Sequence, residues 1–223
     1  MKKRLLLIAA VLLVSCAAAS TIKAETHASQ SDDAYPWFIT VAGGPQVYFS
    51  EYDSLLPFKE RISGGYEIGG GKWFLPWLGA RAMISLGGVN AATMTGVHAD
   101  SPYYYPSSAS SIRLKDQKFH FLNFHVDALF NLSNVVMGSY KEDRIYKCAP
   151  YIGICVVHCW DQPKTTRVAG NVGLYNAFRL AKGWDFNIDL RALVVPDSFN
   201  GEVAGRSGEG MLSASFGFTY NFL

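Results

Sequence analysis

Charged side chains are scarce in this sequence. Asp, Glu, Lys and Arg make up 17% of its 223 residues, whereas about 25% is usual for a soluble domain. The 20 basic residues nearly balance the 18 acidic ones. A nucleic-acid-binding protein usually carries a strongly basic patch, so the composition argues against nucleic acid as a partner. The length suits one barrel or one globular domain.

Long apolar runs are also missing from residues 25–223. Tyr151–Val157 is among the longest, and it falls far short of the roughly 18 residues that indicate a membrane-spanning helix. Backbone polar groups in a bilayer must be satisfied internally, by a helix or by a closed barrel. Any membrane span in this part of the chain must therefore be built from strands.

Cysteine is rare, and three of the four cysteines lie beyond the first 24 residues: Cys148, Cys155 and Cys159. An odd number leaves at least one thiol unpaired. Cys155 and Cys159 share a face of a predicted strand and would lie about 13 Å apart if the strand continued. A disulfide needs Cα atoms within about 7 Å. The pairing stays open, no four-ligand metal set is evident, and we expect no cofactor.

The first 24 residues have the features of a secretory signal peptide. A basic start is followed by the apolar run Leu5–Val14 and then by small residues, which predicts export and removal of this segment. Cleavage is expected after Ala19 or Ala24. The stretch Leu13–Cys16 also resembles a lipobox, so lipidation of Cys16 stays an alternative. The segment holds four basic and no acidic residues, so the rest of the chain is near neutral.

Alternation of apolar and polar side chains dominates residues 25–223, which we interpret as one domain. Between Phe119 and Leu132, apolar residues at even positions alternate with polar ones such as Asn123 and Asp127. A period of two over this length indicates a strand. Eight segments suit tilted transmembrane strands: Phe38–Phe49, Arg61–Phe74, Trp77–Gly88, Phe119–Leu132, Ile145–Val157, Val168–Leu180, Trp184–Val194 and Leu212–Phe222.

The connections between these segments mostly alternate between short and long. The short ones are Leu75–Pro76 and Ala181–Gly183, and Ser133–Arg144 is of medium length. The long ones are Ser50–Glu60, Val89–Lys118, His158–Thr166 and Pro196–Gly208. Short periplasmic turns and long extracellular loops are typical of outer-membrane barrels. The sequence therefore predicts an all-β, eight-stranded antiparallel up-and-down transmembrane β-barrel with both termini on the periplasmic side.

The polar strand faces favour a membrane barrel over a soluble one. They are mostly Asn, Gly, Ser and Thr, and Lys is concentrated in loops and turns, whereas a soluble exterior is rich in both signs of charge. Aromatic residues gather near strand ends, as in the girdles at the two membrane interfaces. We therefore expect apolar faces against lipid and lipopolysaccharide in the outer membrane of a Gram-negative bacterium.

The last strand reads Ser-Phe-Gly-Phe-Thr-Tyr-Asn-Phe-Leu from Ser215 to Leu223. Ser215, Gly217, Tyr220 and Phe222 match the C-terminal assembly signal of outer-membrane barrels, although Leu223 makes the last Phe penultimate. The chain resembles the OmpA/OmpX-like outer-membrane β-barrel superfamily, in particular barrel-only proteins of Bacteroidetes-type bacteria. The resemblance implies the barrel fold and recognition by the barrel-assembly machinery. It implies no catalytic residues and no single function.

With apolar faces outward, several charged side chains point into the lumen. A lone buried charge costs several kcal/mol, and eight strands leave a lumen just wide enough for side chains to fill. We therefore expect a packed polar interior in which three acidic residues pair with three arginines: Glu67, Asp127, Asp189, Arg81, Arg179 and Arg191. An ion path lined by these charges is the alternative.

The loops carry the remaining functional hypotheses. Tyr103, Tyr104 and Tyr105 lie in the longest loop, where Tyr and Ser resemble an adaptable contact surface for an extracellular ligand. A lipid-modifying enzyme would need a His with a Ser or carboxylate on the outer rim, and no convincing triad is evident. We expect a non-enzymatic barrel with a structural or surface-interaction role. The alternative is a narrow channel or a carrier for small or apolar solutes.

Overall fold

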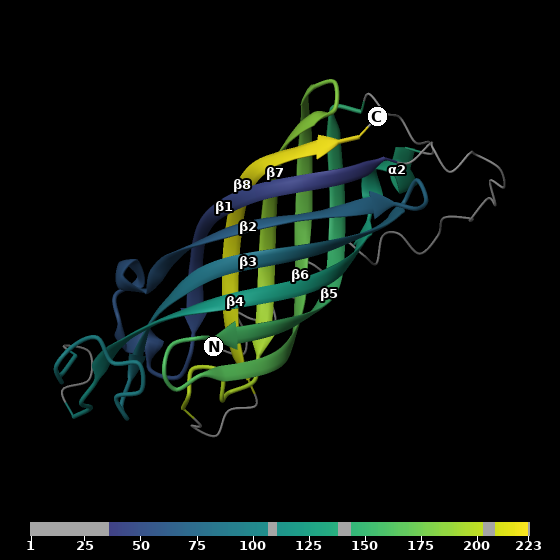
Figure 1. Cartoon of the computed structure of the whole chain (residues 1–223). Helices are drawn as coiled ribbons and strands as arrows, with labels where there is room; N and C mark the ends of the chain where they lie inside the picture. Colours follow the sequence, from purple (N-terminus) through teal and green to yellow (C-terminus); the bar gives the residue numbers. More distant parts are fainter. Residues whose placement is uncertain (1–35, 107–110, 138–143, 203–207, 223) are drawn as a thin grey trace. The chain divides into compact units, whose positions relative to one another are not determined.

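Eight strands form one closed antiparallel barrel in chain order, with β8 hydrogen-bonded to β1 (Figure 1). The computed structural model describes residues 36–106, 111–137, 144–202 and 208–222. The predicted signal peptide and Cys16 lie outside these residues. The predicted fold class is confirmed.

The strand bounds follow the alternation of the sequence closely. The strands are β1 Trp37–Phe49, β2 Ile62–Trp73, β3 Leu78–Thr93, β4 Lys115–Phe130, β5 Tyr146–Cys159, β6 Thr165–Ala181, β7 Trp184–Val195 and β8 Glu209–Asn221. Three short helices join them: η2 Asp53–Leu55, η3 Phe58–Arg61 and α2 Leu132–Met137. No helix in the described ranges is long and apolar enough to cross a bilayer.

Strands β3 and β4 are longer than the sequence predicts. Their pairing continues from Val89 opposite Phe119 to Thr93 opposite Lys115, inside the segment that we expected to be loop. The alternation weakens there because polar side chains occupy both faces of β4, so the hydrophobic pattern ends before the backbone ladder does. The two strands therefore extend past the rest of the barrel (Figure 1).

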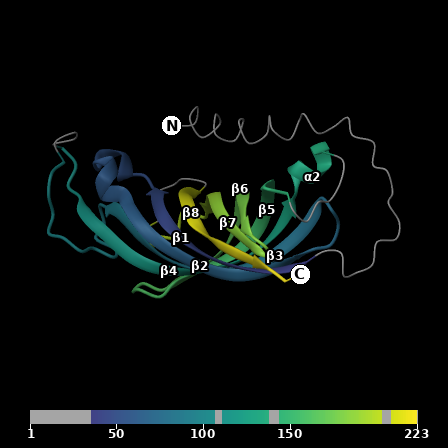
Figure 2. The same cartoon turned by 90° about the horizontal axis from the view of Figure 1, so that it is seen from above.

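The two ends of the barrel differ in their connections. The barrel's first and last strands meet at one end, where the Phe222 amide donates to the Trp37 carbonyl over 2.8 Å. We call this the turn end. The η2 and η3 helices lie at the opposite, loop end, and α2 lies at the turn end (Figures 1 and 2). The medium connection expected at Ser133–Arg144 thus begins with a helix.

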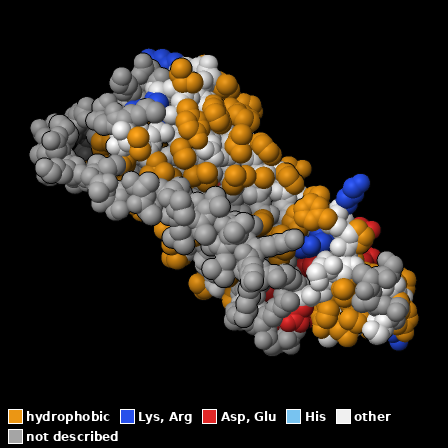
Figure 3. Space-filling view, turned by 180° about the vertical axis from the view of Figure 1, so that it is seen from behind, with side chains coloured by type: hydrophobic (Ala, Val, Ile, Leu, Met, Phe, Trp, Pro, Cys, Tyr) orange, Lys and Arg blue, Asp and Glu red, His pale blue; other side chains and the backbone are white. Residues whose placement is uncertain are grey.

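Side chains alternate between the lumen and the outer wall along each strand. On β4, Asn123, His125 and Asp127 are buried, while Phe124 and Val126 are exposed. Apolar side chains form a band over the wall, and the acidic side chains in view lie toward the loop end (Figure 3). An exposed apolar band of this extent marks a surface that lipid covers, which fixes the polar face as the lumen.

Candidate functional site

A network of charged side chains crosses the middle of the lumen. Arg81 Nε on β3 lies 2.7 Å from Asp127 Oδ2 on β4, and Arg81 Nη2 lies 2.7 Å from Asp189 Oδ2 on β7. On β7, Arg191 Nη2 lies 2.6 Å from Glu67 Oε2 on β2 and 3.8 Å from Asp189. All five side chains are buried. Two arginines thus join four strands through three carboxylates.

Neutral donors complete this network. The Tyr151 hydroxyl donates to Asp189 over 2.6 Å and accepts from Arg191 Nε at 3.1 Å. His125 Nδ1 lies 3.0 Å from Asp127, and Asn171 Nδ2 donates to the same carboxylate over 2.8 Å. Carboxylates that accept several such bonds are held as anions in a low-dielectric interior, so the network stabilises its own charges.

Arg179 takes a different partner from the one expected. Its Nε lies 2.8 Å from Asp185, which also lies 3.0 Å from Lys147 Nζ. This cluster lies near the turn end, where β6 and β7 meet at the Lys182–Gly183 turn. The sequence places Arg179 on the inward face, but only the register shows that Asp185 is its cross-strand neighbour. The expectation that Arg179 pairs with Glu67, Asp127 or Asp189 was wrong.

A layer of buried side chains, mostly aromatic, lies between this cluster and the central network. Phe38, Trp73 and Leu129 are buried there together with Tyr151 and Tyr175. The Arg81 guanidinium lies over the Tyr151 ring at 4.3 Å from its centroid, a cation–π contact that suits a desolvated arginine. The central charges therefore rest on a layer of rings at the turn end.

The loop-end half of the lumen holds a large apolar cluster beside the buried polar residues Gln46 and Glu209, so the interior is not polar throughout as we expected. Its buried cluster consists of Tyr48, Val89, Ala91, Phe119, Phe121, Cys155, Val157, Cys159, Ala169, Leu193, Val195, Phe199 and Met211. Inward positions here alternate with the wall positions as elsewhere, but many of them are apolar like the wall. Amphipathic alternation alone could not predict this layer.

Phe199 closes this apolar layer from the β7–β8 connection. Its ring contacts those of Phe119 and Phe121 edge to face, with centroids 5.6 and 5.8 Å apart. The Thr165 hydroxyl donates to the Phe199 carbonyl over 2.8 Å, which fixes the turn. The sequence predicted only a long loop here. The only sequence feature that could have indicated this role is that Phe199 is an aromatic residue in a mostly polar loop.

Buried carboxylates connect the loops above this layer. Asp53 accepts from the amides of Ser50 at 2.6 Å and Ala92 at 3.1 Å. Glu202 accepts from the Thr93 hydroxyl at 2.5 Å and from the Thr95 amide at 3.1 Å. Burial raises the pKa of Asp53, although its two backbone hydrogen bonds partly oppose this. The loop end is therefore a folded cap.

The predicted tyrosine contact loop is an ordered hairpin at its base. Tyr104 pairs with Leu114 through two hydrogen bonds of 2.9 Å, and the Tyr104 hydroxyl donates to Asp116 over 2.9 Å. Tyr104 packs on the buried Leu114, so it belongs to the cap and is not free for contacts. Tyr103 and Tyr105 are exposed.

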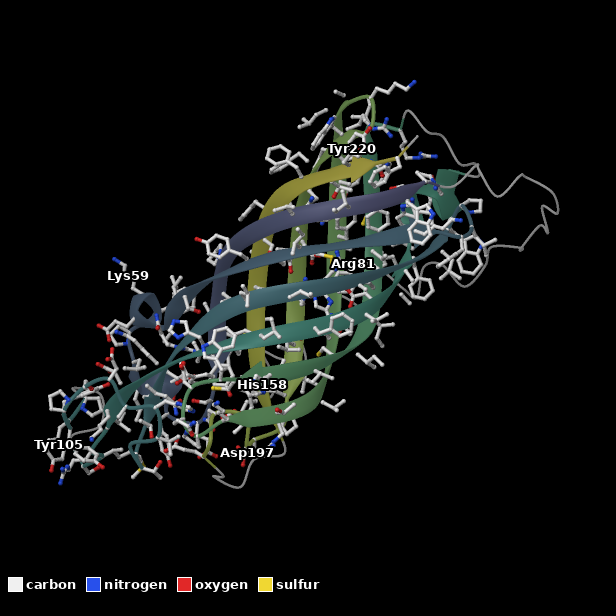
Figure 4. The ribbon with its side chains drawn as sticks, in the orientation of Figure 1. Lys59, Arg81, Tyr105, His158, Asp197 and Tyr220 are labelled. Carbon is white, nitrogen blue, oxygen red and sulfur yellow. The ribbon has the colours of Figure 1, made fainter. Side chains whose placement is uncertain are left out.

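The assembly-signal residues divide between the two faces of β8. Ser215 is buried toward the lumen. A Cβ at Gly217 would lie 2.1 Å from the Val41 carbonyl oxygen, so the close approach of β8 to β1 requires glycine there. Tyr220 packs against Trp184 and Phe222 on the outside, near the turn end (Figure 4). The assembly-signal residues thus include a glycine at a close contact between β8 and β1 and two residues of an aromatic cluster on the outer wall.

One arrangement in the lumen combines a hydroxyl, an imidazole and a carboxylate. His125 Nε2 lies 3.5 Å from Ser85 Oγ, and its Nδ1 lies 3.0 Å from Asp127. The order resembles a nucleophile triad. Strand alternation predicts that His125 and Asp127 share the inward face, and only the β3–β4 pairing brings Ser85 beside them. However, Ser85 Oγ also donates to Glu67 over 3.3 Å, and His125 is fully buried. The contacts suit a structural hydrogen-bond chain.

The cysteines remain unpaired in this structure. Cys148, Cys155 and Cys159 are free thiols, and the last two are buried. Along β5 their spacing follows a continuous strand, so the distance that excludes a Cys155–Cys159 disulfide applies. Within the described ranges, no group of three or more His, Cys, Asp or Glu side chains is arranged to hold a metal ion.

Comparisons with known proteins agree with the barrel. No family model matches the sequence. The chain is 28% identical over 195 residues to outer membrane protein 40 of Porphyromonas gingivalis, covering 83% of this chain and 46% of that protein. It is 25% identical to outer membrane protein 41 of the same bacterium, covering 70% of this chain and 37% of that protein. The chain thus spans less than half the length of these relatives.

A solved structure shows the same architecture. Neisserial surface protein A matches with a TM-score of 0.50 and 10% identity, over 83% of this chain and 97% of that one. An identity this low supports the fold alone. The closed strand ring, the apolar wall and the similarity to two outer-membrane proteins lead to one conclusion. This chain is an eight-stranded β-barrel protein of the bacterial outer membrane.

Proposed function

We propose that this protein is a closed outer-membrane barrel whose role is structural and surface-interactive, carried by its folded loop end. The observation that supports this most is the stacking of three side-chain layers across the lumen: the apolar layer at the loop end, the central ion pairs and the aromatic layer at the turn end. Together they occupy the space through which a solute would pass.

Each layer opposes conduction for its own physical reason. An ion entering the apolar layer would lose most of its hydration, which costs several kcal/mol where polar partners do not replace it. In the central layer, Arg81 and Arg191 already hold the three carboxylates, so a passing ion must break buried pairs. The proposal therefore places function on the outer surface and not in the lumen.

Planar-bilayer recordings on refolded protein test the closed lumen. We expect no steady current at either polarity. Phe199→Ala serves as a matched variant, and it should also stay silent because the ionic and aromatic layers remain intact. Steady ohmic conductance of the unaltered protein would overturn the proposal and favour the narrow-channel alternative.

A carrier for apolar solutes is the second candidate. The apolar lining of the loop-end half of the lumen supports it, since this layer would solvate a hydrocarbon ligand once Phe199 moved aside. Saturable binding of a fluorescent fatty acid that Phe199→Trp abolishes would support a carrier. Partition into the detergent alone, unchanged by that substitution, would exclude it.

Two further partners belong to this proposal. The exposed apolar wall supports contact with outer-membrane lipid, including lipopolysaccharide in the outer leaflet. The β8 positions Ser215, Gly217, Tyr220 and Phe222 would be read by the barrel-assembly machinery, supported by the place of β8 at the seam with β1. Crosslinking of a photoreactive residue at Phe222 to the assembly machinery in cells would test this, and loss of the crosslink in Gly217→Val is expected.

A further inference from the structure

The hairpin of the β3–β4 connection presents a face of two tyrosines and two cations. Tyr104 and Leu114 form an isolated β-bridge and pack on the cap, and their chain neighbours are less buried. These neighbours are Tyr103, Tyr105, Arg113 and Lys115, and we call them the cationic hairpin face. The Tyr103 ring lies 4.1 Å from Arg113 Cζ and 4.4 Å from Lys115 Nζ.

Within the described residues, no carboxylate forms an ion pair with either of these two cations. The sequence from residue 101 to 115 contains no Asp or Glu. The flanking acids are used elsewhere: Asp100 lies 2.7 Å from Lys118 Nζ, and Asp116 accepts from the Tyr104 hydroxyl. Among the residues that the structure describes, Arg113 and Lys115 have ring contacts but no ion pair. Elsewhere in the protein, the buried arginines all have carboxylate partners or backbone acceptors.

The two cations of the cationic hairpin face repel each other, and a bound anion would relieve this repulsion. Two positive charges beside the same Tyr103 ring repel each other, and an exposed cation–π contact compensates only weakly. An anionic group bound between Arg113 and Lys115 would remove this repulsion. Charge-assisted hydrogen bonds from a guanidinium and an ammonium are among the stronger polar contacts. The face is therefore complementary in charge to a polyanion.

The position of this face points to a ligand outside the cell. Tyr105 lies at the far tip of the loop end, beyond the barrel wall, whereas His158 marks the outer part of the wall itself (Figure 4). Lipid head groups surround the wall and not the tip of the hairpin. An extracellular polymer would therefore meet the tip of the hairpin first.

We propose that the cationic hairpin face binds acidic polysaccharides, which rests on the surface-interaction role proposed above. Arg113 and Lys115 would hold the sulfate or carboxylate groups. The Tyr105 ring, 60% exposed, offers an apolar platform for the face of a sugar ring, since tyrosine combines an apolar body with a polar tip. Rigid tyrosines lose little conformational entropy on binding, and the Tyr104–Leu114 bridge anchors the segment between Tyr103 and Tyr105.

The test measures binding of dextran sulfate to full-length protein in nanodiscs, with neutral dextran and poly-glutamate of similar size as reference polymers. We expect salt-sensitive binding of dextran sulfate, little binding of dextran and weaker binding of poly-glutamate. Arg113→Gln with Lys115→Gln should weaken dextran sulfate binding at least about tenfold, and Tyr105→Ser should weaken it several-fold.

The matched control removes two other exposed loop-end cations, Lys59 and Lys164, by substitution with Gln. It lowers the net charge equally and should change affinity less than about twofold. An equal loss in this control would overturn the proposal in favour of general charge attraction. Equal binding of poly-glutamate would overturn the polysaccharide class. Conductance recordings are independent of all these polymers, so failure of the closed-lumen proposal is distinguishable from failure of this one.

Discussion

Arg81 shows how a single residue can organise the lumen. It contacts two carboxylates on different strands and lies over the ring of Tyr151, so three strands depend on one guanidinium. Lysine could not replace it, because an ammonium lacks the planar set of donors that reaches both Asp127 and Asp189. Removal of Arg81 would leave two buried anions without their main partner.

Arg81→Met should therefore destabilise the barrel by about 3–5 kcal/mol. The measurement is urea unfolding in lipid vesicles, followed by tryptophan fluorescence. Arg179→Met is the control. In this variant Asp185 still has Lys147 as an ion-pair partner at 3.0 Å, and the Arg179 side chain is partly exposed at the turn end. Equal losses in the two variants would show that the central pairs contribute no more than a peripheral one.

Asp53 makes the stability of the cap depend on pH. Burial raises the pKa of Asp53 in the folded cap, so the folded form binds the proton more tightly than the unfolded chain does. The stabilisation is complete below the ordinary pKa of an aspartate, about 4, and is lost as the pH rises through the higher folded value. The cap should thus open more readily at neutral pH than in mild acid.

Hydrogen exchange at the Ala92 amide, which donates to Asp53, measures this opening. Between about pH 4 and neutrality, the opening free energy of the unaltered protein should fall, after correction for intrinsic exchange. Asp53→Asn cannot ionise and should show a flatter profile. Asp161→Asn, in the β5–β6 turn, should retain the original slope. Parallel profiles for Asp53→Asn and the unaltered protein would refute the role of Asp53.

At the scale of elements, the seam between β1 and β8 closes the barrel. Its ladder runs from Phe38 opposite Asn221 to Phe49 opposite Gly210. Closure brings the backbones very close at two glycines: a Cβ at Gly44 would lie 2.0 Å from the Ala214 carbonyl oxygen, and one at Gly217 would lie 2.1 Å from the Val41 carbonyl oxygen. Backbone atoms cannot move aside as a flexible side chain can, so glycine is a structural requirement at both positions.

Gly217→Ala should destabilise the barrel by about 1–3 kcal/mol, as overpacking does elsewhere, and should slow its folding into lipid. Gly210→Ala, on the same strand, is the control because its Cβ would meet no atom closer than 4.0 Å. Gel mobility without heating separates folded from unfolded barrel and follows both variants. A folded fraction of Gly217→Ala equal to that of Gly210→Ala would contradict the tight seam.

At the scale of the whole molecule, the outer wall determines where the protein resides. Outward positions on β5 change from Ile152, Ile154 and Val156 to His158 toward the loop end, and the exposed Trp160 follows just after the strand. The apolar part of this series matches the band that lipid covers, and His158 lies where the band ends. The same change from apolar to polar side chains occurs on β4 between Leu122 and His120.

Ile154→Arg should cost about 2–4 kcal/mol of folding free energy in lipid, because it places a charge near the bilayer midplane. Ile154 is 73% exposed on the wall, so no internal contact explains such a loss. His158→Arg should cost at most about 1 kcal/mol, since it lies near the interface. Equal costs for both substitutions in reversible vesicle unfolding would mean that the wall is not immersed as proposed.

The sequence alone determined the strands, their number and their faces. Period-two alternation marks which residues meet lipid, because strand side chains alternate by geometry. It also identified Arg81, Asp127, Glu67, Asp189 and Arg191 as inward charges. Pairing of most of these charges was foreseeable, since an unpaired charge inside a barrel is too costly.

Only the tertiary structure decided which groups meet across the lumen. Arg179 faces Asp185 because of the β6–β7 register, and register depends on pairing between strands that the local sequence does not specify. Likewise, Phe199 fills the loop-end half of the lumen from a loop that shows no periodicity. Local alternation is a property of one strand, whereas closure, layering and the cationic hairpin face arise from several strands together.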